Sequence, residues 1–135
     1  MISYFKRKSQ NLSTAIEAIY GLRVSNDSDK SLKLASETFA GMVDFDLDSI
    51  LKTHPADFVE EIKKLNYSNS YLNTIVNLML ETAAIFTSLN KENEALNLEN
   101  KALQLLKYLS EHDKTYSEVR TQQMNLLEEK IKRKW

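Results

Sequence analysis

The chain has 135 residues and a formal net charge of −1, so it lacks the basic excess that a nucleic-acid-binding surface requires. Its two glycines and one proline argue against a β fold, whose turns need many residues with positive φ, and the absence of cysteine excludes disulfides and thiolate metal sites. No apolar run approaches the roughly 20 residues of a membrane span, so we expect an all-α, cytoplasmic protein without a nucleic-acid or membrane partner.

Residues 1–43 are expected to form one helical hairpin. Apolar residues recur at nearly helical spacing over 2–24, and the sequence SNDSD (25–29) supplies turn and N-cap residues. A second helix follows, and Gly41 is placed where a glycine commonly ends a helix.

The N-terminal sequence MISYFKRKSQ combines aromatic and basic residues. No apolar segment follows them, so a secretory signal is not expected. Two interpretations stay open for this segment: a helix that packs its apolar stripe into the domain, or an amphipathic helix on a membrane surface.

Residues 44–66 are expected to form an insert of short helices. The sequence DFDLDSILK (44–52) supplies aspartates that can cap a first helix, and Pro55 suits the first position of a second helix within 53–65. The sequence NYSNS (66–70) ends that helix.

Three longer helices are expected after the insert, over residues 70–88, 92–109 and 114–134. The first two form a hairpin, and the third closes the end of the array as a long C-terminal cap. The expected organisation is a single domain, 1–135, built from the hairpin 1–43, the insert 44–66, the hairpin 70–109 and the C-terminal helix 113–134. For Trp135 three roles stay open: packing against a neighbouring helix, anchoring a dimer, or fraying with the helix end.

Four residues at regular spacing predict how the hairpin 70–109 packs. Ala83 precedes Phe86 by three residues, so both lie on one face of the first helix, and Ala95 and Ala102 lie two turns apart on the second. Two antiparallel helices approach closely where one side of each crossing is small. The alternative is that alanine is simply the best helix former, which gives the same fold class.

This spacing resembles the tetratricopeptide repeat (TPR), a helix–turn–helix unit of 34 residues. Its small, aromatic, small and small positions are matched by Ala83, Phe86, Ala95 and Ala102 within residues 76–109. The repeat is degenerate, because Glu99 stands where the family usually has an aromatic residue and no proline follows. Residues 8–43 resemble a second, more decayed unit, and the outline is similar to small bacterial TPR-like proteins of no known activity.

The helix 70–88 also carries a polar stripe that includes Asn73, Asn77 and Glu81. The first helix of each TPR hairpin lines a concave groove, so the resemblance implies that these three residues bind a peptide there. Asparagine amides offer both donors and an acceptor to a peptide backbone. Two other interpretations stay open: a strip exposed to solvent, or hydrogen bonds to the N-terminal hairpin.

No pattern in the sequence indicates a catalytic or metal site. The triplet Asp44, Asp46 and Asp48 begins like a calcium-binding loop, but such a loop needs glycine and glutamate where Ser49 and Pro55 stand. The two histidines, His54 and His112, lie far apart in sequence, and nucleophile-elbow, P-loop and dinucleotide-binding patterns are missing. We expect no enzyme, no catalytic residue, no metal and no cofactor.

The expected function is therefore a non-catalytic protein–protein interaction module that binds a peptide or protein segment through a TPR-like groove. The alternative is a structural or self-assembling helical protein, a homodimer without a separate ligand. In that case the apolar surface of the helices would be buried in a symmetric interface.

Overall fold

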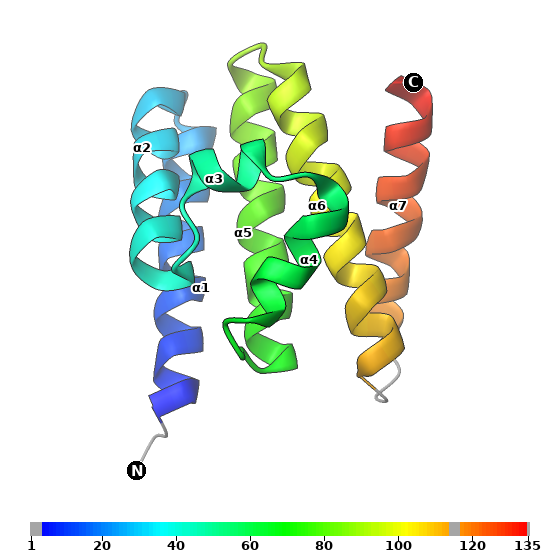
Figure 1. Cartoon of the computed structure of the whole chain (residues 1–135). Coiled ribbons are helices and arrows are strands. Elements are labelled where there is room, and N and C mark those ends of the chain that lie inside the picture. The colour runs from blue at the N-terminus through cyan, green and yellow to red at the C-terminus, as the bar shows by residue number, and fades with distance from the viewer. Residues whose placement is uncertain (1–3, 114–116, 135) are drawn as a thin grey trace.

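The computed structural model describes residues 4–113 and 117–134, and within these ranges the chain is helical without a strand, which confirms the all-α prediction. Figure 1 shows α1 (Tyr4–Val24), α2 (Ser28–Thr38), α3 (Leu47–Lys52), α4 (Pro55–Lys63), α5 (Asn69–Ser88), α6 (Glu92–His112) and α7 (Glu118–Lys134). A π-helical turn, η1 (Phe39–Val43), continues α2. Trp135 and the predicted start of the last helix at residue 114 lie outside the described residues.

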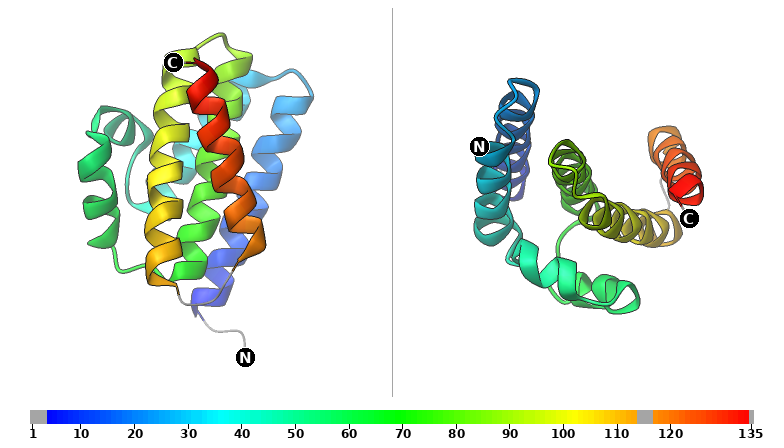
Figure 2. Two further views of the ribbon diagram at one scale, coloured as in Figure 1. Left: turned by 90° about the vertical axis from the view of Figure 1, so that its right-hand side faces the viewer. Right: turned by 90° about the horizontal axis from the view of Figure 1, so that it is seen from above.

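The helices form two rows with the insert beside them. Seen from above in Figure 2, α1, α5 and α7 lie along one side, α2 and α6 along the other, and α3 and α4 lie beyond α2 and α6. The chain runs in the same direction through α1, α5 and α7 and returns through α2 and α6 (Figure 1). In the described part of the chain no further helix lies outside the row α1, α5 and α7, which we call the open side, whereas the insert lies outside the other row (Figure 2).

Asparagine and aspartate, not glycine, make the tight turns of this chain. Neither glycine has a positive φ, whereas four other residues do: Asn26 (63°), Asp44 (60°), Asn66 (55°) and Asn90 (61°). Their short polar side chains make the left-handed region more accessible than it is to other residues with a Cβ. The prediction that Gly41 ends the second helix is wrong, because the helix passes through Gly41 in η1 and ends at Asp44.

Side-chain caps fix where the shorter helices begin. Asp46 accepts a hydrogen bond from the backbone N–H of Ser49 (3.2 Å) and another from its hydroxyl (2.8 Å), and these bonds lower the pKa of Asp46 below its usual 3.8. His54 caps α4 through its Nδ1, which accepts from the N–H of Ala56 at 3.1 Å. Asp44 is the C-cap of η1 and does not begin α3; its carboxylate accepts from the hydroxyl of Tyr67 at 3.1 Å.

The N-terminal segment packs against the start of α5 as far as its side chains are described. The ammonium group of Lys8 lies 4.6 Å from the ring centre of Tyr67 and 5.1 Å from that of Tyr71. Both distances lie within the range of a cation–π interaction. At Lys8, therefore, the basic start of the chain contacts the domain.

The α5–α6 hairpin forms the centre of the molecule. The chain reverses between Ser88 and Glu92, and all four residues that the sequence singled out for packing are buried: Ala83 (3% exposed), Phe86 (4%), Ala95 (0%) and Ala102 (0%). Helix α6 extends three residues beyond the predicted end at 109. The ring of His112 stacks on Tyr108 at 4.2 Å, and its Nδ1 lies 2.9 Å from the Tyr108 carbonyl oxygen, which stabilises this additional turn.

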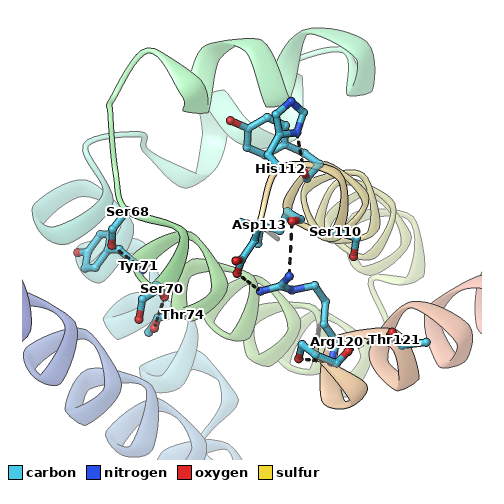
Figure 3. A network of polar contacts seen from close by, with 12 residues as sticks. Ser68, Ser70, Tyr71, Thr74, Ser110, His112, Asp113, Arg120 and Thr121 are labelled. Carbon is cyan, nitrogen blue, oxygen red and sulfur yellow. Dashed lines mark hydrogen bonds and ion pairs between the residues drawn. The ribbon is translucent and has the colours of Figure 1, made fainter. Parts of the chain in front are cut away.

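Helix α7 is attached to α6 by polar contacts as well as by apolar ones. Leu127 is buried, but Val119 and Leu126 are 67% and 68% exposed. Figure 3 shows Arg120 reaching back to Asp113 at the end of α6 (3.1 Å); the guanidinium also donates to the carbonyl of Leu109. These bonds satisfy acceptors at the C-terminus of α6 and bring the start of α7 close to it.

Glu99 takes part in the same attachment. This residue lies on α6 and is 2% exposed. Its Oε2 lies 2.6 Å from the ammonium group of Lys130 on α7, while its Oε1 is buried without a hydrogen-bond partner among the described residues. A second pair, Lys107 and Glu128, joins the same two helices at 3.6 Å with both side chains 47% exposed.

We predict that Ala102→Leu destabilises the protein by about 1–3 kcal/mol, because a buried site in the closely packed hairpin has no room for a larger side chain. The matched control is Ala18→Leu, at an exposed position of α1, which should change stability by less than about 0.5 kcal/mol. Urea denaturation measures both values. Equal unfolding midpoints for the two variants would contradict close packing at Ala102.

We predict that Lys130→Met costs more stability than Lys107→Met. The first change leaves the buried Glu99 carboxylate with neither oxygen paired, a loss of about 1–3 kcal/mol. The second removes an exposed pair, which contributes at most about 1 kcal/mol. The same urea titration compares them, and a larger loss for Lys107→Met would show that Glu99 is not held by Lys130.

Candidate functional site

The open side of α1 and α5 carries an unusually polar surface. A cavity of about 690 Å³ lies there between the two helices. Among the described residues its lining consists of hydroxyl and amide side chains with a single carboxylate: Ser9, Gln10, Ser13, Thr14 and Glu17 from α1, and Ser68 and Ser70 from the start of α5. This surface offers many neutral hydrogen-bonding groups and little charge.

The predicted stripe continues from this cavity along α5. Ser70 precedes Asn73 by three residues and Asn77 by seven, so the three side chains lie on one side of the helix. On α7, Gln123 approaches the same side and donates from Nε2 to the Oδ1 of Asn77 at 3.4 Å. We call the surface made by Ser13 and Ser70, Asn73, Asn77 and Gln123 the polar face.

The three predicted peptide-binding residues differ in burial and in their hydrogen-bond partners. Asn73 is half-buried, and its Oδ1 is shielded from solvent without a hydrogen-bond partner in the described part of the chain. Asn77 is exposed and makes the long bond to Gln123. Asn77 therefore presents its amide on the polar face, whereas the unpaired Oδ1 of Asn73 lies beneath that surface.

Glu81 forms an ion pair with Arg23 on α1. Its Oε2 lies 2.6 Å from Nε of Arg23 and its Oε1 lies 3.4 Å from Nη2, so the two groups pair through both oxygens. The carboxylate side chain is only 10% exposed. This pair ties the last turn of α1 to α5, so Glu81 makes the contact to the N-terminal hairpin that one of the open interpretations describes.

Lys101 on α6 is a buried polar residue that the sequence analysis did not identify. Lys101 is 1% exposed, and its ammonium group donates to the carbonyls of Ile50 (2.6 Å) and Leu51 (3.2 Å) and to the Oδ1 of Asn97 (2.6 Å). The two carbonyls belong to the last turn of α3, so Lys101 caps that helix from a neighbouring element. Burial lowers the pKa of Lys101 below its usual 10.5, because the charged form loses hydration.

A signal for this burial was present in the sequence. Lys101 follows Leu98 by three residues and precedes Leu105 by four, so it lies on an apolar face of α6, and both leucines are fully buried. A lysine at such a position usually reaches past the apolar surface to solvent. Lys101 stays buried here because its ammonium group donates to carbonyls of α3, which lie about fifty residues earlier in the chain.

The described residues contain neither a cluster of metal ligands nor a membrane-spanning helix. No three histidine, aspartate or glutamate side chains gather there as a metal site would require. None of the described helices combines the length and apolar composition needed to cross a bilayer.

Comparison with known proteins assigns no family to the chain. No protein-family model, no curated protein and no solved structure matches it. The TPR interpretation therefore depends on the residues of this sequence and on the arrangement of its helices.

We predict that Lys101→Met changes how stability depends on pH. Because the folded-state pKa of Lys101 lies below 10.5, the unfolded chain binds this proton more tightly between the two values. The wild type therefore gains stability relative to Lys101→Met as the pH rises through that interval. Urea denaturation of both proteins from neutral pH to 10.5 measures the difference, and a difference that stays constant would contradict a lowered pKa.

Proposed function

We propose that the chain is a non-catalytic interaction module of the TPR type that binds an extended segment of a partner protein on the polar face. The observation that carries this proposal is the Oδ1 of Asn73, a buried acceptor without a partner among the described residues. An unpaired buried acceptor costs free energy, which a donor from a bound ligand can recover once the Asn73 side chain turns its amide toward the open side. The backbone N–H of an extended peptide is such a donor.

The chemistry around Asn73 supports a peptide as the ligand. Asn77 is exposed, and its present bond to Gln123, at 3.4 Å, is long for an N–H···O contact. A peptide backbone offers donors and acceptors that can replace this bond. The neighbouring cavity adds further hydroxyl and amide groups with Glu17 as its single charged residue, so the face suits the neutral backbone of a ligand more than a charged side chain.

The arrangement of helices supports the TPR interpretation. Helices α1, α5 and α7 run in one direction along the open side (Figure 2), as the first helices of successive hairpins would in a repeat array. The small residues of the α5–α6 hairpin are buried at the expected positions. The absence of cysteine fits a role in the reducing cytoplasm.

We predict that the double variant Asn73→Ala, Asn77→Ala loses its protein partners. Removing two hydrogen bonds of about 1 kcal/mol each weakens binding by more than about tenfold. Tagged protein is used to capture partners from native lysate, and mass spectrometry quantifies each partner against the wild type. The matched control is Asn11→Ala, Asn125→Ala, two exposed amides on α1 and α7 that belong neither to the polar face nor to the cavity beside it, and this variant should retain the same partners.

The alternative function, that of a self-assembling helical protein, is supported by a separate observation. Val119 and Leu126 lie seven residues apart on α7, and both are about two-thirds exposed, at 67% and 68%. Two such residues on one helix face can form the centre of a symmetric contact. Light scattering over a hundredfold dilution, about 1 to 100 μM, distinguishes the two functions: a dimer that persists, together with equal capture by both asparagine variants, would replace the peptide-binding proposal.

A further inference from the structure

A second cavity lies on the other side of α6, between that helix and the connection from α3 to α4. Its volume is about 530 Å³, within the range of small-molecule sites. One wall consists of Leu51, Lys52, Thr53, His54 and Pro55, and the other of Asn93, Leu96, Asn97, Asn100 and Lys101 on α6. We call it the α3–α6 cavity. Figure 2 shows the insert and α7 on different sides of α6, so this cavity is separate from the polar face.

The charged side chains that line the α3–α6 cavity are all basic. Its lining includes two lysines, a histidine and three asparagines, and no aspartate or glutamate. The ammonium group of Lys101 is surrounded by carbonyl and amide oxygens, and no carboxylate in the described ranges lies within ion-pair distance of it. A buried cation without a counter-ion creates a positive potential in the adjoining space, since screening is weak there.

Several donors at the edge of the cavity remain available to a ligand. Lys52 makes no ion pair with any described residue, and the amides of Asn93 and Asn100 make no hydrogen bond within the described chain. His54 accepts a hydrogen bond at Nδ1, so its neutral ring carries the proton at Nε2 and can donate from there. The positive end of the α4 dipole, at Pro55, faces the same region.

We infer that the α3–α6 cavity binds a carboxylate anion, either a free organic acid or the acidic side chain of a peptide. An ammonium group, an imidazole N–H and two primary amides form a set of donors that suits a carboxylate, which only accepts hydrogen bonds. No carboxylate among the described residues that line the cavity repels the bound anion. The bound anion joins the α3–α4 connection to α6 and supplies the counter-charge that Lys101 lacks.

The test titrates the full chain with glutarate and, separately, with the blocked peptide acetyl-Ala-Glu-Ala-amide, at constant ionic strength. Backbone and side-chain amide NMR signals of residues 52–57 and 93–101 report binding. We expect saturable shifts confined to these residues with at least one of the two probes. Binding of glutarate alone identifies a free acid as the ligand, and binding of the peptide identifies an acidic segment.

Two controls make the result decisive. The variant Lys52→Met, Asn100→Ala removes one charge and one amide at partly or fully exposed positions, and it should weaken binding by about tenfold or more while leaving the urea midpoint nearly unchanged. Glutaramide, the neutral analogue of glutarate, should cause no saturable shift. Equal shifts with glutaramide, unchanged affinity in the variant, or no saturation with either probe would overturn the inference.

The proposed function is tested independently of this site. Asn73→Ala, Asn77→Ala should bind the carboxylate probe with the affinity of the wild type, because both residues lie on the polar face. Loss of probe binding in that variant would place the anion outside the α3–α6 cavity and overturn the inference.

Discussion

Contact between α5 and α6 determines where every other helix can lie. These two helices bury most of the apolar side chains of the second half of the chain, and their small residues, Ala83, Ala95 and Ala102, are almost fully buried. Helices α1 and α2 pack against α5, whereas α3, α4 and α7 pack against α6. A change in the spacing of the central pair would therefore move all the surfaces that the other helices contact, since a closely packed core transmits such displacements.

Buried polar groups give the outer elements their specific positions on this apolar centre. An apolar helix surface accepts a neighbour at several angles and registers, but a buried charge must meet its partner at hydrogen-bond distance. Lys101 holds the end of α3, Glu99 binds Lys130 of α7, and Arg23 pairs with Glu81 between α1 and α5. These contacts add little net stability once desolvation is included, so their effect is mainly to select one arrangement.

The sequence predicted features that depend on neighbouring residues and missed those that depend on distant ones. Helix positions follow from apolar periodicity and from caps such as Asp46, so their ends were predicted within a few residues. Gly41 was predicted to end the second helix because glycine is the commonest residue at helix ends. The helix ends at Asp44 instead, because aspartate also tolerates the left-handed conformation. The ion pair of Glu81 could not be predicted in detail because its partner, Arg23, lies 58 residues away, and the burial of Lys101 was missed for the same reason.

The two polar surfaces differ in a way that separates their ligands. Among its described residues the polar face is neutral, apart from Glu17 in the adjoining cavity, so a peptide bound there would be selected by shape more than by charge. The α3–α6 cavity is cationic and contains no carboxylate, so its selectivity comes from charge. Asn97 lies in that cavity and also binds both Lys101 and the carbonyl of Leu51. An anion bound there would therefore act on the contact that holds the insert against α6, without touching the face where a peptide would lie.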